Sequence, residues 1–166
     1  LYEVTEYTWN ELHKKYDIAT LQQVVASRRN AMNMILHNIN KLAIDCNLEI
    51  VPMYQVENDK SIDIDREIEI ATQLSLPVER LQQQSFPLPF HKGLLYSNQA
   101  HINPLSYVQQ LSNNIAEAGC KIYENSHINE IEEDKTSRKI FLKTDKATIT
   151  ARTVIHATHT PLGLQL

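Results

Sequence analysis

The stretch that decides the fold runs from Leu94 to Ile131 and reads LLYSNQAHINPLSYVQQLSNNIAEAGCKIYENSHINEI. Its first residues are apolar and predict a short strand. Asn103 can cap free backbone N–H groups, and Pro104 supplies a backbone angle that suits the first position of a helix. Gly119 suits the left-handed conformation that commonly ends a helix. The stretch therefore predicts a strand followed by a helix over residues 104–118.

Apolar residues recur along this helix at intervals of three and four, which places them on one helical face. They are Leu105, Val108, Leu111, Ile115 and Ala118. After Gly119 the chain resumes an extended pattern from Cys120 to Ile131. We therefore predict a βαβ-like unit in which the apolar helical face is buried.

The residues before this unit predict two further helices and one strand. Leu1 to Tyr16 predicts a strand or an irregular lead-in, followed by a short helical turn. Thr20 to Cys46 has the period of a long amphipathic helix, which Asn47 can end. Glu49 to Val56 predicts a strand. Because proline cannot donate a hydrogen bond to a sheet ladder, this is either an edge strand or a strand broken at Pro52. Ile64 to Leu74 predicts a further helix.

Charged side chains on these helices are expected to face solvent. Arg28 and Arg29 fall outside the apolar period of the long helix. Four acidic residues near the start of the later helix predict a solvated helix surface and not a metal site. They are Asp63, Asp65, Glu67 and Glu69. Negative charge is favourable near a helix N-terminus.

The residues after Ile131 predict three short antiparallel strands and a fourth apolar one. Asp134 and Ser137 suit a hairpin turn. Lys139 to Lys143 alternates around apolar residues, a second turn follows at Asp145, and Ala147 to Ala151 completes a meander. Thr153 to Ala157 is apolar and predicts one more strand. The fold class is therefore α+β, with a mixed sheet, about three main helices and a small antiparallel meander.

Composition limits the classes of function. The 166 residues carry a net charge of −4, with acidic and basic residues interspersed, which argues against a nucleic-acid partner. No apolar run approaches the roughly 20 residues that span a bilayer, and no signal peptide is evident. The two cysteines, Cys46 and Cys120, fall at apolar positions and are expected to be buried free thiols of a cytoplasmic protein.

The sequence offers no metal site and no catalytic residue. Seven histidines are dispersed, without an HExxH motif or a cluster with cysteine. Two isolated cysteines cannot provide the paired Cys and His ligands of a Rieske cluster. No GxSxG motif is present. Tyr54, Gln99 and His101 lie beside apolar runs and are candidates for a polar cleft, or alternatively for satisfying buried backbone groups.

The order of weak motifs from Ala26 to Leu162 resembles one family. NQAHINP precedes a helix, AGCKIYENSHINEI follows it, and TARTVIHATHTPL follows a hairpin. This order resembles FAD-dependent oxidoreductases of the D-amino-acid oxidase and glycine oxidase type, in the branch that often carries a Rieske iron–sulfur domain. The GxGxxG fingerprint of that family is absent here. The resemblance thus implies an internal segment of a two-domain flavoprotein, inactive by itself.

The resemblance also implies where the cofactor would lie. In such enzymes the segment corresponding to Ser126-His127-Ile128 passes the adenine end of FAD, and the segment Val154 to Thr158 ends against the cofactor. The cofactor-binding candidates are therefore Ile128, Ala157 and Thr158. The family commonly ends this segment with glycine, which lets the backbone approach FAD closely. His159 stands there instead, which puts the close approach in doubt.

The expected division of labour follows from the same resemblance. Residues 1–98 would belong to a substrate-binding portion and residues 99–166 to the edge of the FAD-binding portion, the two forming one compact unit in isolation. The parent would transfer a hydride from a small amine-type substrate to FAD, with Tyr54, Gln99 and His101 as substrate candidates. The alternatives are a non-catalytic α+β module that binds a protein and a regulatory domain that binds another ligand.

Overall fold

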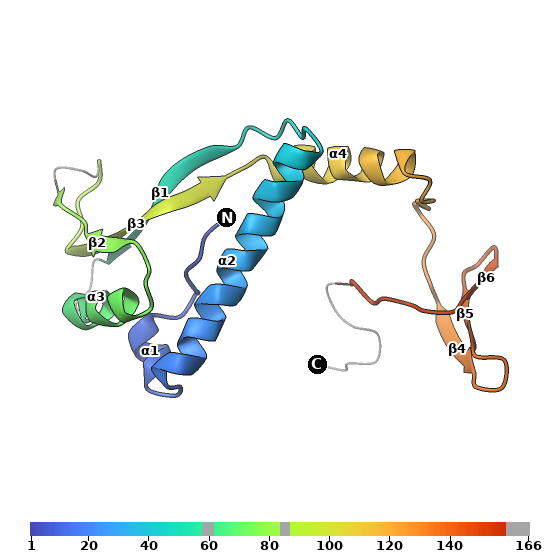
Figure 1. Ribbon diagram of the computed structural model, residues 1–166, viewed down its shortest axis with the longest axis horizontal. Coiled ribbons are helices and arrows are strands. Elements are labelled where there is room, and N and C mark those ends of the chain that lie inside the picture. The colour runs from blue at the N-terminus through green and yellow to red at the C-terminus, as the bar shows by residue number, and fades with distance from the viewer. Residues whose placement is uncertain (58–61, 84–86, 159–166) are drawn as a thin grey trace. The chain divides into compact units, whose positions relative to one another are not determined.

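The computed structural model describes residues 1–57, 62–83 and 87–158 (Figure 1). The chain divides into two compact units, Leu1–Cys120 and Lys121–Leu166. This division comes at the end of the fourth helix. The boundary between residues 98 and 99, predicted for the substrate and FAD portions, lies within the strand β3 (Lys92–His101) and stays a prediction.

The first unit contains a three-stranded sheet of order β1-β3-β2, with β1 at Glu49–Glu57 and β2 at Val78–Arg80. Both pairings are antiparallel, with Met53 and Val78 each opposite Tyr96. The β1–β3 register shifts between Val51 and Met53, where Pro52 lies. The prediction of an edge strand interrupted at this proline is confirmed.

Three helices accompany this sheet: α1 (Trp9–His13), α2 (Ile18–Lys41) and α3 (Ile64–Gln73). The residue before each helix caps it. The side chains of Thr8, Asp17 and Asp63 accept hydrogen bonds from the backbone N–H groups of Glu11, Thr20 and Arg66, respectively. The predicted helices at 20–46 and 64–74 are confirmed in type. However, α2 ends at Lys41, because Ala43 already has a φ of +50°.

The core of the first unit lies between the helices and one face of the sheet. Leu94 and Tyr96 alternate along β3 and point into this core, as the two-residue period of a strand requires. Trp9 of α1, Leu21 of α2 and Ile70 of α3 are almost completely buried with them. Figure 1 shows α1 and α3 together at one end of α2. The helices thus cover one sheet face.

The fourth helix, α4 (Pro104–Glu117), has the predicted ends. Asn103 Oδ1 accepts from the backbone N–H groups of Leu105 and Ser106, each at 3.1 Å, and Gly119 has a φ of +92°. The predicted buried face is right only in part, because Leu105 and Val108 are 64% and 56% exposed. Leu111 of the predicted face packs, together with Tyr107, beside a small core of Ile39, Ile44 and Cys46.

The second unit is an antiparallel meander of β4 (Glu130–Asp134), β5 (Lys139–Lys143) and β6 (Thr148–Ala151), as predicted. The predicted strands at 120–128 and 153–157 are absent, because neither segment meets a partner strand within the described residues. No parallel pair therefore forms there, and β3-α4-β4 is not a βαβ unit. The α+β class is confirmed, but the described sheets are antiparallel where a mixed sheet was expected.

Several residues predicted at the surface or in the core lie elsewhere. Glu67 is only 1% exposed, and Arg28 and Arg29 contact the N-terminal segment. Cys46 is buried as expected, whereas Cys120 is exposed because it follows the exposed end of α4. In the part of the chain that the structure describes, no helix is long and apolar enough to cross a membrane.

Candidate functional site

The candidate site is a pocket of about 330 Å³ within the second unit. The meander forms one side of it, since Ile131 of β4 and Leu142 of β5 stand directly opposite each other in the register. Two segments outside the strands complete the lining. These residues are Ser126, His127 and Ile128 from the first segment and Val154, Ile155, His156 and Thr158 from the second. The pocket therefore joins two segments nearly 30 residues apart.

Alternation along the strands separates this pocket from the charges of the meander. Lys143 Nζ lies 3.0 Å from Glu130 Oε2 and 2.6 Å from Glu132 Oε1. These three residues flank Leu142 and Ile131 in sequence, so the two-residue period turns them to the opposite face. The ion pairs raise the pKa of Lys143, and the hydrogen bond from Lys143 lowers the pKa of Glu132. The pocket side of the meander is accordingly apolar.

The backbone that follows the first segment is already hydrogen-bonded to the meander. Asn129 N–H donates to Lys143 O at 2.8 Å, which extends the β4–β5 pairing by one residue before Glu130. Ile128 lies just outside this ladder. An extended backbone beside an apolar pocket can offer N–H and C=O groups to the edge of a flat ligand, in the way that strand edges recognise partners.

The second segment presents apolar side chains with little protein cover. Ile155 is 86% exposed, although it contributes to the pocket lining. An exposed apolar side chain beside a pocket suits a surface that a ligand or another protein segment covers. Ala157 lies between two lining residues without lining the pocket itself. The cofactor candidates Ile128 and Thr158 thus meet at one pocket, with Ala157 adjacent, and His159 lies outside the described residues.

The substrate candidates Tyr54, Gln99 and His101 lie in the first unit, each in different surroundings. Gln99 is 2% exposed, and its Oε1 accepts from Glu3 N at 2.8 Å while its Nε2 donates to Ser97 O at 2.7 Å. His101 Nε2 lies 3.5 Å from Glu49 Oε2 at the end of the sheet. Tyr54 lies in the middle of β1, opposite Leu95 and 40% exposed. Gln99 satisfies backbone groups, as the alternative interpretation expected.

A further pocket of about 320 Å³ lies on the sheet face away from the helices. It is next to the irregularity at Pro52, and Leu95 and Ser97 contribute to its lining together with Glu79 of β2. Because Leu94 and Tyr96 point into the core, their neighbours Leu95 and Ser97 point to this open face. Patterns in the sequence did not predict this pocket, because it depends on the pairing of three separate strands.

The described residues contain no group of three or more histidine, cysteine, aspartate or glutamate residues placed to hold a metal ion. The most deeply buried acid, Glu67, instead serves the fold. Its Oε1 accepts from Trp9 N at 2.6 Å and its Oε2 from Asn10 N at 2.9 Å, at the start of α1. Burial raises the pKa of this carboxyl, although the two hydrogen bonds oppose the rise.

Comparison with known proteins identifies the family. The family model for FAD dependent oxidoreductases, DAO, matches residues 5–164. The chain belongs to this family.

Two known proteins are similar to this chain. The Bacillus subtilis (strain 168) protein named "Putative Rieske 2Fe-2S iron-sulfur protein YhfW" is 24% identical over 155 residues, which are 92% of this chain and 30% of that protein. The crystal structure of glycine oxidase from Geobacillus kaustophilus matches with a TM-score of 0.69 at 15% identity, over 78% of this chain and 38% of that one. The chain therefore spans about a third of each relative.

Proposed function

We propose that this chain is an internal segment of an FAD-dependent oxidoreductase that removes a hydride from a small amine-type substrate. Family membership supports the flavin, and the glycine oxidase relative supports a small amine or amino acid as substrate. One observation carries the proposal for this chain. The two segments that resemble the FAD-facing parts of the family line a single pocket in the second unit.

The lining of this pocket fits the adenosine end of FAD. A volume of about 330 Å³ lies at the lower end of the range for small-molecule sites. Ile131, Leu142 and Val154 offer apolar surface to a flat ring. Polar residues also line the pocket: Ser126, His127, His156 and Thr158. We assign Ile128, Ala157 and Thr158 to this contact, with backbone and small side chains doing most of the binding.

The described residues do not fit the pyrophosphate of FAD. Phosphate groups are held by glycine-rich loops at helix N-termini. Gly93 is in a strand, where an added Cβ would lie 3.0 Å from Leu81, and Gly119 ends α4. Gly163 lies outside the described residues. The proposal therefore places the pyrophosphate on another part of the complete polypeptide.

The first unit is proposed as the substrate-binding portion. Its open sheet face carries Tyr54, Leu95 and the pocket beside Pro52, whereas the helices cover the other face. Gln99 would act indirectly, by fixing the N-terminal segment through Glu3. His101 remains a substrate candidate at the end of the sheet. When bound, the flavin would accept the hydride, so no acid or base of this chain is assigned to catalysis.

The cysteines support a cytoplasmic location as part of this proposal. Cys46 is a buried thiol and Cys120 an exposed one, and neither forms a disulfide. Exposed free thiols persist in reducing compartments.

The decisive experiment replaces Thr158 by Trp in the complete polypeptide and measures its ratio of bound flavin to protein. A pocket that accepts a flat ring leaves no room for an added indole, so flavin occupancy should fall at least severalfold. Ile128→Val is the matched control, because it keeps the β-branched shape and should leave occupancy nearly unchanged.

Circular dichroism establishes that both variants are folded. Full flavin occupancy in a folded Thr158→Trp variant would place this pocket away from the cofactor. The proposal for residues 126–128 and 154–158 would then fail, while family membership would stand.

A further inference from the structure

The pocket of about 320 Å³ beside Pro52 lies where the sheet of the first unit is irregular. The β1–β3 register shifts on either side of Pro52, so two residues of β3 lie opposite this one proline. These are Ser97 and Asn98, and Asn98 has a φ of +58°, a left-handed value that asparagine tolerates better than most residues. Such a bulge redirects the side chains of a strand. Here two consecutive polar residues of β3 both line one pocket.

Three polar side chains line this pocket, and none of them has a hydrogen-bond or ion-pair partner among the described residues. They are Glu79 of β2, Ser97 and Asn98. The rest of the lining is apolar, so Glu79 is its one charged group. The neighbouring cation, Arg80, is paired with Asp65 of α3. The pocket therefore combines an apolar surface with one negative charge that the described chain does not neutralise.

The strand register extends this surface across the open face of the sheet. Tyr54 of β1 and Glu79 of β2 both lie opposite Leu95 of β3. Residues that pair across adjacent strands point to the same face of a sheet. With strands about 4.8 Å apart, Tyr54 and Glu79 are roughly 10 Å from each other, on either side of Leu95. A carboxylate and an aromatic ring both attract a cation.

An ammonium group carries a positive charge and three N–H donors. The pocket offers it three kinds of acceptor, namely the carboxylate of Glu79, the hydroxyl of Ser97 and the amide oxygen of Asn98. We propose that this pocket selects a primary amine that lacks a carboxylate group. Its ammonium donates to Glu79, and its apolar body lies against Leu95. This inference rests on the proposed substrate-binding role of the open sheet face, and it chooses the simple amine over the amino acid.

The charge of the lining disfavours an amino acid. An amino acid that placed its ammonium at Glu79 would bring its own carboxylate close to the Glu79 carboxylate, because only one carbon separates its two charged groups. Like charges at such a separation repel each other. No cation lines the pocket to offset this repulsion. Glu79 is therefore assigned as a residue that determines substrate specificity.

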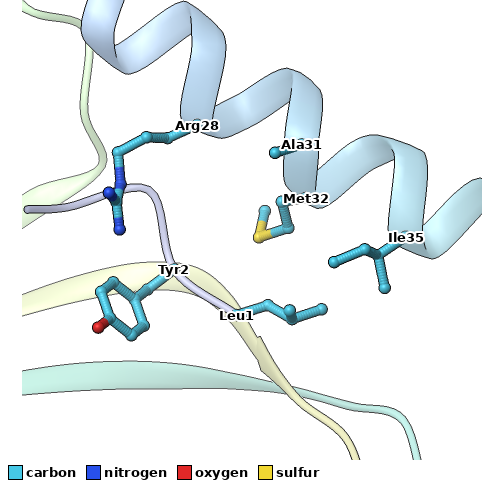
Figure 2. A pocket seen from close by; sticks show the side chains of 6 residues that line it. All are labelled: Leu1, Tyr2, Arg28, Ala31, Met32 and Ile35. Carbon is cyan, nitrogen blue, oxygen red and sulfur yellow. The ribbon is translucent and has the colours of Figure 1, made fainter. Parts of the chain in front are cut away.

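Another pocket of the first unit carries the opposite charge. It has a volume of about 390 Å³ and lies between the N-terminal segment and α2. Figure 2 shows Arg28 extending from α2 toward the ring of Tyr2, and its guanidinium lies 5.4 Å from the ring centroid. A guanidinium repels an ammonium group. An amine should therefore bind at Glu79 in preference to this second pocket.

The test titrates the 166-residue chain with 2-phenylethylamine in a calorimeter at neutral pH. Phenylalanine is the matched ligand, because it is the same molecule with a carboxylate on the carbon that bears the amine, and 3-phenylpropionate carries a carboxylate alone. The amine should bind saturably, with a Kd at least about tenfold lower than that of either matched ligand. Absence of saturable binding, or equal Kd values for the amine and phenylalanine, would overturn the proposal. The titration contains no flavin, so this failure would leave the flavin test of Thr158→Trp unaffected.

Variants locate the binding at Glu79, whose exposed side chain can be replaced without disturbing the core. Glu79→Gln should raise the Kd for 2-phenylethylamine at least about tenfold. Glu117→Gln removes the same charge from the exposed end of α4 and should leave the Kd unchanged. Glu79→Lys reverses the charge and should make 3-phenylpropionate the tighter ligand. An unchanged Kd for the Glu79→Gln variant, or a preference of the Glu79→Lys variant for the amine, would refute the assignment.

Discussion

Glu67 shows how one buried carboxylate stabilises a short helix. Helix α1 has five residues, too few to be stable alone in water. The Glu67 oxygens accept from the N–H groups of Trp9 and Asn10, and Thr8 Oγ1 accepts from Glu11 N at 3.1 Å. The free donors of the first turn are thereby satisfied. The cost is a carboxylate placed in the core, which raises its pKa.

The raised pKa of Glu67 predicts a pH dependence of stability. The folded-state value lies above the usual 4.5, so the folded protein binds more protons than the unfolded one between the two values. The stability contributed by this group is fully present below the unfolded-state pKa and is lost as pH rises through the folded-state value. The free energy of unfolding of the unmodified chain, minus that of Glu67→Gln, should therefore fall as pH rises above about 4.5.

Urea unfolding followed by tryptophan fluorescence measures this difference. The single tryptophan, Trp9, is in direct contact with Glu67, because its backbone N–H donates to the Glu67 carboxylate. Glu132→Gln gives the contrasting case. Lys143 lowers the pKa of Glu132, so its contribution is present above the unfolded-state pKa and is lost as pH falls. A difference for Glu67 that rises with pH would show that the hydrogen bonds outweigh burial.

Sequence patterns could have revealed Glu67 but could not have revealed the role of Arg29. Glu67 is three residues from both Ile64 and Ile70, so it lies on the apolar stripe of α3. That spacing was visible in the sequence and favoured burial over a solvated face. The partner of Arg29, Glu3, is 26 residues away, and no local pattern predicts such a pairing.

The sequence predicted the helices and strands whose signals are local. Asn103 and Pro104 begin α4, Gly119 follows its end, and Pro52 marks the irregularity in β1. These residues act on the backbone within a few positions. The segments 120–128 and 153–157 have apolar patterns of equal clarity, yet a strand requires a partner edge, which the described residues do not offer them.

The contacts of α4 predict the effects of substitutions along it. Leu111 is half-buried in the second core, so Leu111→Ala should cost about 1–2 kcal/mol, less than the 2–5 kcal/mol typical of fully buried leucines. Gln110 lies beside Leu111 in sequence, and its side chain is paired with Asp45: its Oε1 accepts from Asp45 N at 2.9 Å and its Nε2 donates to Asp45 O at 2.6 Å. Gln110→Ala should therefore cost about 1 kcal/mol.

Chemical denaturation of the two variants measures these costs. Leu105→Ala and Asn113→Ala are matched controls on exposed positions of the same helix and should change the free energy of unfolding by less than about 0.5 kcal/mol. A large loss from Leu105→Ala, with none from Leu111→Ala, would mean that α4 packs through Leu105 and not through Leu111.

At the scale of the whole molecule, the proposed functions divide between the two units. The pocket proposed for the adenosine end belongs to the second unit, and the open sheet face belongs to the first unit. The resemblance predicts that Ile128 and Thr158 contact one cofactor. Both residues line one pocket, and their role in cofactor binding stays a prediction. Local patterns could not predict the pocket beside Pro52, since it depends on strands paired across the fold.

The proposed functions of the two units lead to a prediction for the isolated chain. It should be colourless and should have no catalytic activity. Binding of FAD requires anchors for both the adenosine end and the pyrophosphate, and the described residues fit only the first. The phosphate groups carry the charge, so their contacts at a glycine-rich loop contribute much of the affinity. The 166-residue chain should therefore elute from gel filtration without flavin after incubation with excess FAD, whereas the complete polypeptide should retain it. The visible absorbance of the eluted protein measures the difference. A stoichiometric yellow chain would mean that its own backbone groups suffice to hold the cofactor, and the proposed dependence on another part of the polypeptide would then be wrong.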